Sequence, residues 1–278
     1  MMALLLLLSL ASCAWLDTQQ RRIIYRPTLA ANSAPAALGP GGESFFLQTG
    51  TTAPADQVSL WWLPHTNPGA PTLLYLHGTF RNLEGNRPKI DALRQAGFSV
   101  LALDYRGWGQ STPITPSEKT IVHDARLAWA ELVRREPRSA QRVIYGHSMG
   151  SGAAVALAST LTSPGDLGAV ILESAFTSFD DIAASAGFWP GLLSRLTNER
   201  FASINKIAQV HAPLLMLHGD QDHTVPMALG QRLFAAANAP KQWVTIAGAK
   251  HSDLHRFAPE RYQAAITAFS EQYLLQTQ

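Results

Sequence analysis

The chain has 278 residues, of which 46% are apolar and 15% charged, and its formal net charge is +2. A disordered protein would have fewer apolar residues and a larger net charge, and the near-balance of charges excludes the basic footprint of a typical nucleic-acid-binding protein. One cysteine cannot form a disulfide framework or a multi-thiolate metal site, and only the first 16 residues come close to a membrane-spanning apolar run. The length suits one α/β domain.

The first 16 residues lack charged side chains, and their short leucine run, Leu4 to Leu8, is typical of an export signal. The only cysteine, Cys13, directly follows Leu10-Ala11-Ser12. This string resembles the lipobox of bacterial lipoproteins, in which the signal is cut before a cysteine that is then acylated. The resemblance implies a signal peptide over residues 1–12, lipidation of Cys13, and a lipid-anchored protein at the periplasmic or outer surface of a bacterial envelope. An ordinary signal, an uncleaved anchor and a core helix are the alternatives.

Residues 13–42 hold clusters of Ala, Pro and Gly, which predict a tether. Within it, the apolar residues Ile23, Ile24 and Tyr25 could dock on the domain that follows. That domain is predicted to cover residues 43–278.

From residue 43 onward, short apolar runs alternate with amphipathic or alanine-rich segments. Two strands, predicted at 44–48 and 58–63, lie close together and indicate an antiparallel pair. Further strands are predicted at 72–76, 99–103, 142–145, 169–172, 213–217 and 242–246. Helices are predicted at 86–96, 117–135, 148–161, 227–237 and 259–275. This alternation predicts a mostly parallel, eight-stranded α/β sheet covered by helices on both faces, with an active site at the carboxyl ends of the strands.

The strand predicted at 142–145 leads into Gly146-His147-Ser148-Met149-Gly150, and a helix follows. This sequence matches the G-x-S-x-G nucleophile elbow in its required strand–turn–helix setting. Side chains at the two flanking positions would collide with neighbouring backbone, which accounts for glycine at both. The alternative is a plain glycine-rich turn.

A serine nucleophile needs a base within hydrogen-bond reach, and an acid must orient that base. The expected chain order on this layout is Ser, then Asp or Glu, then His. Asp222 follows the seventh predicted strand and His251 follows the eighth, so both stand in that order. Asp220 and Glu173 are the alternative acids, although a buried hydrogen-bonding role is favoured for Glu173.

Four segments together identify the chain as similar to a known family: Leu76-His77-Gly78-Thr79, Asp104-Tyr105-Arg106-Gly107-Trp108-Gly109-Gln110-Ser111, the elbow, and His218-Gly219-Asp220-Gln221-Asp222. They resemble the α/β-hydrolase-fold serine hydrolases, in the small-lid branch of lysophospholipase-like, serine-aminopeptidase-like and depalmitoylating enzymes. The resemblance implies the nucleophile Ser148, the acid Asp222 and the base His251. It also implies an oxyanion hole of the backbone N–H groups of Met149 and Thr79, and a small helical lid at about residues 176–211.

The function implied is that of a carboxylic ester hydrolase, which cleaves an ester or thioester of a small-molecule or lipid-like substrate through an acyl-enzyme on Ser148. An acyltransferase, an aminopeptidase or amidase with the same triad, and an inactive surface-tethered binding module are the alternatives. No cofactor, metal or nucleic acid is expected, and His251 with His255 lacks the glutamate of an H-E-x-x-H zinc motif. The natural substrate and the oligomeric state stay open.

Overall fold

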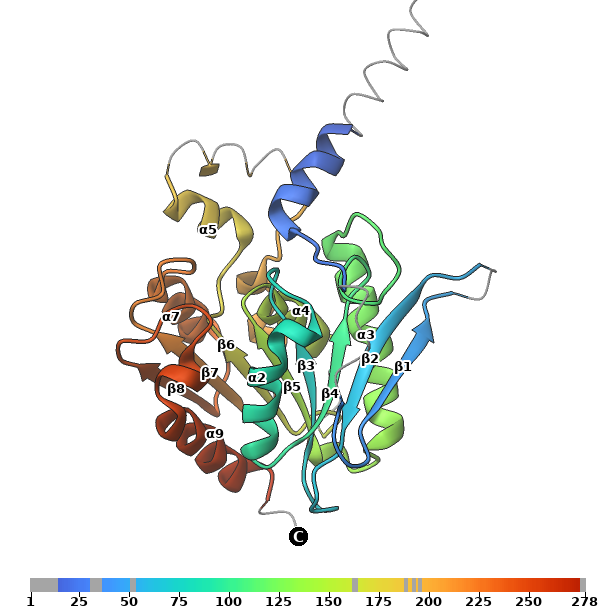
Figure 1. The fold of residues 1–278 in the computed structure, drawn as a ribbon. Coiled ribbons are helices and arrows are strands. Elements are labelled where there is room, and N and C mark those ends of the chain that lie inside the picture. The colour runs from blue at the N-terminus through green and yellow to red at the C-terminus, as the bar shows by residue number, and fades with distance from the viewer. Residues whose placement is uncertain are drawn as a thin grey trace, which may run out of the picture.

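The computed structural model describes residues 15–30, 37–50, 54–161, 165–187, 190–191, 194 and 197–275. These residues form an eight-stranded sheet with the strand order β1-β2-β4-β3-β5-β6-β7-β8. β2 is antiparallel to both of its neighbours, β1 and β4, and the other neighbouring strands run parallel. The predicted fold class, a mostly parallel eight-stranded sheet with helices on both faces, is therefore confirmed (Figure 1).

The strands are β1 (Glu43–Gln48), β2 (Gln57–Leu63), β3 (Thr72–Leu76), β4 (Ser99–Asp104), β5 (Arg142–His147), β6 (Ala169–Glu173), β7 (Leu214–Gly219) and β8 (Lys241–Ile246). The helices of the domain include α2 (Leu83–Gln95), α3 (Glu118–Arg135), α4 (Met149–Ala158), α5 (Phe179–Ser185), α7 (Met227–Ala236), α8 (Leu254–Phe257) and α9 (Pro259–Tyr273). The largest shifts from the predicted bounds among these are three residues, at the end of α4, which ends at Ala158 and not at 161, and at the start of α2, which begins at Leu83 and not at 86. At the start of α2 the Asn82 side chain accepts the Gly85 N–H at 3.1 Å and caps the helix.

Buried apolar side chains form two clusters, one on each face of the sheet. One cluster takes residues from α3, α4 and α7, and the other takes residues from α2 and α9. Every residue of β3, β4, β6 and β7 is buried, as expected for parallel strands covered on both sides. Each large apolar side chain buried in this way stabilises the fold by about 1.5–3 kcal/mol, so the sheet is a rigid platform for the loops at its edge.

The helix formed by residues 15–25 stands beside α5 (Figure 1). It ends on Tyr25, which is fully buried and packs its ring against Trp108 and Phe201, with ring centres 6.4 and 6.5 Å away. The Tyr25 hydroxyl donates a hydrogen bond to Glu199. Part of the segment predicted as a tether is thus packed on the domain through Tyr25. Cys13 and the predicted signal over residues 1–12 lie outside the described residues. In the part of the chain that is described, no helix is long and apolar enough to cross a membrane.

Between β6 and β7 the chain leaves the sheet and forms α5 and two 3₁₀ turns, η2 (Ser203–Asn205) and η3 (Ile207–Gln209). This is the segment predicted as the lid. The rings of Phe176 and Phe179 stack with centres 5.2 Å apart, and Phe201 contacts Phe179 edge-on at 5.2 Å. The described part of the insert therefore packs a small aromatic cluster of its own. Residues 188–189, 192–193 and 195–196 of the insert lie outside the described residues.

Candidate active site

Ser148 occupies a sharp turn between β5 and α4. Its φ of 54° and ψ of −123° lie in a region that residues other than glycine rarely adopt, at a cost of roughly 1–3 kcal/mol. A Cβ at Gly146 would lie 2.4 Å from the Gly150 carbonyl oxygen, and a Cβ at Gly150 would lie 2.0 Å from the Leu76 carbonyl oxygen. Only glycine fits at both flanking positions, and the turn holds the half-buried Ser148 above the sheet.

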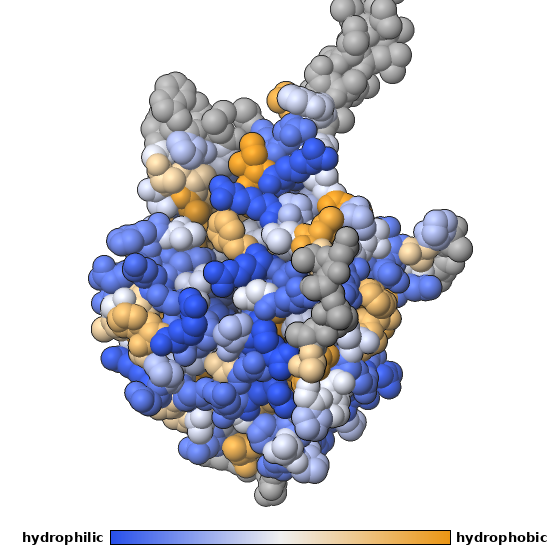
Figure 2. Space-filling view, viewed as in Figure 1, coloured by the Kyte–Doolittle hydropathy of each residue, from blue (hydrophilic) through white to orange (hydrophobic). Residues whose placement is uncertain are grey.

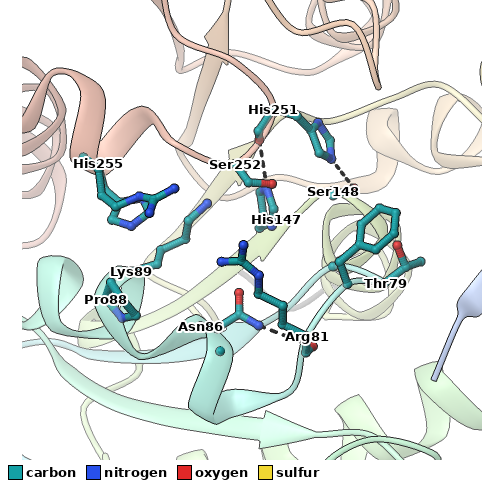
Figure 3. Close-up of a pocket in the computed structure, with 14 residues that line it drawn as sticks. Thr79, Arg81, Asn86, Pro88, Lys89, His147, Ser148, His251, Ser252 and His255 are labelled. Carbon is teal, nitrogen blue, oxygen red and sulfur yellow. Dashed lines mark hydrogen bonds between the residues drawn. The ribbon is translucent and has the colours of Figure 1, made fainter. Parts of the chain in front are cut away.

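Three loops bring the serine, the histidine and the aspartate together. The Nε2 atom of His251, on the loop after β8, lies 2.9 Å from the Ser148 Oγ, and Figure 3 shows the ring pointing toward the serine. The Nδ1 atom of the same ring lies 2.8 Å from the Oδ2 of Asp222, on the loop after β7. Both distances are those of a working nucleophile–base–acid arrangement. The three side chains therefore form a single hydrogen-bonded row, in which the base can accept the serine proton.

The surroundings of Asp222 keep it ionised. Its Oδ1 accepts the backbone N–H groups of Thr224 at 3.0 Å and Val225 at 2.8 Å, and the ring of His218 lies 3.4 Å from its Oδ2. Burial opposes the negative charge, but the hydrogen bonds from His218 and His251 outweigh burial and hold the pKa of the Asp222 carboxyl well below its usual range. The charge fixes the His251 tautomer that leaves Nε2 free to act as a base.

The alternative acid Asp220 faces a different loop. Its Oδ1 accepts the backbone N–H of Gly248 at 2.7 Å, which ties together the turns after β7 and β8. Asp220 is thus a loop anchor, two residues away from the carboxylate that contacts His251.

Glu173, the other alternative acid, ends β6 and is fully buried. It forms an ion pair with Lys89 and accepts a hydrogen bond from the Tyr145 hydroxyl. Burial is the largest single effect and raises the pKa of Glu173, but the charge of Lys89 and the hydrogen bonds from Lys89 and Tyr145 together lower this pKa to about 2. Between this pair and the triad stands His147, whose Nε2 lies 3.1 Å from the His251 carbonyl oxygen and 3.8 Å from Glu173 (Figure 3). Glu173 is therefore held in a buried ion pair and does not contact His251, in agreement with the hydrogen-bonding role favoured from the sequence.

His147 is a supporting residue. Burial, followed by the charge of Lys89, lowers the pKa of His147 to about 3, so the ring is neutral near pH 7. A neutral ring whose Nε2–H donates to the His251 carbonyl holds the loop of the base in place. Ser174 donates to the same carbonyl oxygen at 3.1 Å.

The two residues predicted to form an oxyanion hole border the same cavity next to Ser148. Met149 is the first residue of α4, where a backbone N–H has no partner within the helix. Thr79 follows β3, and its carbonyl accepts the Trp108 indole N–H at 3.0 Å, which anchors this loop. A Cβ at Gly78 would lie only 3.1 Å from the Ser148 Cβ, so the loop passes directly beside the serine.

Two cavities meet at Ser148. The larger, of about 540 Å³, is walled by apolar residues of the insert and of the N-terminal helix, among them Ile23, Phe176, Phe179 and Ile182. Figure 2 shows apolar side chains gathered where the N-terminal helix approaches the insert. The smaller, of about 180 Å³, is bordered by His251 and by basic side chains (Figure 3).

Lys89 is a site residue that the sequence-based prediction missed. It lies on the buried face of α2 together with Asn86, Ile90 and Leu93, at helical spacings of three and four residues. A lysine within such a stripe has to find a buried partner, and this pattern was the available signal. Among the described residues, no group of three or more His, Cys, Asp or Glu side chains is arranged to bind a metal ion.

Comparison with known proteins gives consistent results. The family model described as "Serine aminopeptidase, S33" matches residues 70–206, and that of the dienelactone hydrolase family matches residues 167–276. An uncharacterized protein of Mycobacterium tuberculosis is 36% identical over 240 residues, which cover 85% of this chain and 82% of the relative. Lysophosphatidylserine lipase ABHD12 of Rattus norvegicus is 33% identical over 196 residues, covering 64% of this chain and 48% of the lipase, so the match spans about half of that protein. The solved structure of Pyrococcus furiosus esterase Pf2001 superposes with a TM-score of 0.69 at 20% identity, covering 89% of this chain and 97% of the esterase.

Proposed function

We propose that this chain, which belongs to the α/β-hydrolase family and is a hydrolase, cleaves carboxylic esters, including thioesters. The reaction proceeds through an acyl-enzyme on Ser148. The observation that carries the proposal is the hydrogen-bonded row of Ser148, His251 and Asp222, with distances of 2.9 and 2.8 Å. Its position at the junction of two cavities leaves room for a substrate on both sides of the serine.

In the proposed reaction, His251 Nε2 takes the proton of Ser148 Oγ while that oxygen attacks the substrate carbonyl carbon. Asp222 holds the ring and stabilises the imidazolium that forms. The N–H groups of Met149 and Thr79 receive the negative charge of the carbonyl oxygen, each at a gain of roughly 3–4 kcal/mol. The imidazolium then gives its proton to the leaving alcohol or thiol as the C–O or C–S bond breaks. Water activated by the same ring hydrolyses the acyl-enzyme and restores the serine.

The large apolar cavity favours an acyl chain as the part of the substrate that stays on the enzyme. Its walls are predominantly apolar, and its only acidic lining residue among those described is Glu199. That carboxylate already accepts the Tyr25 hydroxyl and lies 3.1 Å from Arg21. Neither cavity therefore offers a free carboxylate among its described residues for the ammonium group of a peptide substrate, which favours an ester over aminopeptidase chemistry. The lipase activity named for the Rattus norvegicus relative supports a lipid-like ester.

The proposal includes an envelope location with a lipid on Cys13. The helix of residues 15–25 begins two residues after Cys13 and contributes to the wall of the apolar cavity. An acyl anchor at Cys13 would therefore hold the cavity near the membrane surface, where lipid-like esters are found. Mass spectrometry of the protein from bacterial membranes tests this part, because the mature chain is expected to begin at an acylated Cys13.

The test of the catalytic proposal compares Ser148→Ala with Ser159→Ala, a serine substitution just beyond the other end of α4. The wild-type protein and the Ser159→Ala variant should hydrolyse p-nitrophenyl acyl esters and form a covalent adduct with a fluorophosphonate probe. Ser148→Ala should lose both. Ester hydrolysis that survives in Ser148→Ala refutes the acyl-enzyme, and a product that forms only with an added alcohol acceptor identifies an acyltransferase instead.

A further inference from the structure

The two cavities at Ser148 have different roles in the proposed reaction. His251 borders the small cavity and not the large apolar one. Because the histidine must hand its proton to the departing oxygen or sulfur, the leaving group has to depart on the histidine side of the serine. If the proposed function holds, the small cavity is therefore the leaving-group site.

The charged side chains that line the small cavity are basic. Its described lining includes Arg81, Lys89 and Arg256 and no aspartate or glutamate. Glu173, behind the wall, pairs with Lys89 and compensates its charge. Arg81 and Arg256 are both exposed, and neither forms an ion pair with a carboxylate of the described residues. Two guanidinium groups that have no ion-pair partner among the described residues thus border a cavity of about 180 Å³.

The backbone around Arg81 indicates that its position is built into the loop. Arg81 has a φ of 71°, in the left-handed region where asparagine or glycine would be less strained. A glycine in the first turn of α2 accommodates the Arg81 side chain, because a Cβ at Gly85 would lie 2.7 Å from the Arg81 Cβ. Figure 3 shows the guanidinium reaching toward His147 and Lys89, into the space bordered by the cavity residues. Backbone strain of this kind is typical of positions held in place for a ligand.

The pKa of His255, on the wall of the same cavity, is affected both by burial and by the neighbouring charges. Burial, followed by the charge of Lys89, lowers the pKa of His255 to about 4, and Arg256 acts in the same direction. Asp253 and Glu173 act in the opposite direction without reversing the shift. The positive charges of Lys89 and Arg256 thus add to the effect of burial in disfavouring a proton on His255.

We propose that the small cavity binds an anionic group, a phosphate or a carboxylate, carried by the leaving alcohol. Guanidinium groups bind both anions through paired, charge-assisted hydrogen bonds. The substrate class inferred is thus an acyl ester whose apolar chain occupies the large cavity while its charged alcohol part contacts Arg81 and Arg256. This inference rests on the proposed function and deepens it.

The test measures hydrolysis of three esters with the same octanoyl chain, which is short enough to keep them dispersed in solution. They are octanoylglycerol, octanoylglycerol 3-phosphate and octanoylglycerol hemisuccinate. The wild-type kcat/KM for at least one anionic ester is expected to exceed that for the neutral ester about tenfold or more. In Arg81→Gln and Arg256→Gln, the ratio of the anionic to the neutral kcat/KM should fall about tenfold, mainly through KM. Arg261→Gln, which removes the same charge from an exposed position of α9, should leave this ratio unchanged.

The phosphate and carboxylate arms show which anion the cavity prefers. Equal kcat/KM values for neutral and anionic esters in the wild type would overturn the inference while leaving the esterase proposal intact. An unchanged ratio in both arginine variants would overturn it as well. A second readout needs no anionic ester: glycerol 3-phosphate should inhibit p-nitrophenyl butyrate hydrolysis competitively, glycerol should not, and Arg81→Gln should weaken the inhibition. If the fluorophosphonate probe does not label Ser148 of the wild-type protein, the proposed function itself is wrong.

Discussion

Replacing Lys89 by Met tests how much of the fold depends on the buried ion pair behind the triad. The side chains of Lys89 and Glu173 are 3% and 0% exposed, and their charged groups are in contact. Met keeps most of the aliphatic length of the lysine, so the packing of α2 changes little while the positive charge disappears. Glu173 would then be a buried carboxylate whose remaining partners are the hydroxyls of Tyr145 and Tyr262.

The expected cost is large for a single substitution. Removing one member of a buried ion pair destabilises a protein by about 3–5 kcal/mol, because the other charge stays desolvated without compensation. For a domain of this size, each kcal/mol corresponds to about 2–4 °C in Tm. Thermal unfolding followed by circular dichroism should therefore show a Tm lower by about 6–20 °C.

The destabilisation caused by Lys89→Met should decrease as the pH falls. In the wild type, Lys89 lowers the pKa of Glu173 to about 2 from a usual 4.5, so the stabilisation is complete above pH 4.5 and disappears as the pH falls through 2. In Lys89→Met, burial without the cation raises the pKa of Glu173, and the folded variant gains stability as the pH falls and the carboxyl takes up a proton. The Tm difference between the two proteins should be larger at pH 7 than at pH 4.5.

Two further variants make the comparison specific. Arg200→Met removes a charge from the surface pair with Asp180, whose side chains are 50% and 28% exposed, and should cost less than about 1 kcal/mol. Lys89→Met combined with Glu173→Gln removes both charges and keeps an acceptor for the tyrosines, and should recover at least half of the lost stability. If Lys89→Met costs no more than Arg200→Met, the reasoning from burial is wrong.

Three other substitutions test the geometry around the serine. Asp222→Asn should lower kcat by roughly 10⁴-fold, because an amide favours the wrong His251 tautomer. Asp220→Asn should keep most of the activity. The reverse result in steady-state assays would identify Asp220 as the acid. Ser148→Gly should be more stable than Ser148→Ala by about 1 kcal/mol in urea unfolding. Both variants lose the hydroxyl, but only glycine adopts the φ of 54° without strain. Equal stability would show that the turn is unstrained. Gly78→Ala places a Cβ 3.1 Å from the Ser148 Cβ and should lower kcat about tenfold. Gly50→Ala, whose Cβ would meet nothing within 4 Å, serves as the control. An unaffected kcat in Gly78→Ala would mean that the loop shifts freely.

The sheet could be predicted from the sequence because its signals are local. Each central strand is a short apolar run, and each is followed by turn residues that end it. The convergence of Ser148, Asp222 and His251 followed from the same information, since the carboxyl ends of parallel strands lie along one edge. Their hydrogen bonds did not follow from it, because distances between loops depend on backbone turns that no local pattern specifies.

The contacts that could not be predicted join segments that are distant in the chain. Tyr25 is buried because Trp108, Phe179 and Phe201 surround it, and these residues lie on segments far apart in the chain. The sequence indicated that Tyr25 could dock on the domain, but the three rings that it contacts could not be predicted, because no local pattern links it to them. In the same way, the partner of Lys89 is 84 residues away, so the lysine alone could not reveal the ion pair.

The surroundings of Ser148 divide the chemistry of the site between two sets of loops. The turn before α2 and the helix α8 supply Arg81 and Arg256 on the side of His251, whereas the insert and the N-terminal helix supply the apolar wall on the other side. None of these segments contributes a member of the row Ser148–His251–Asp222. Because the row is held by the ends of β5, β7 and β8, the outer loops can change substrate preference without disturbing the bond-breaking step. Substitutions at Arg81 or Arg256 should accordingly act on which ester binds, while those at the strand ends should act on whether any ester is cleaved.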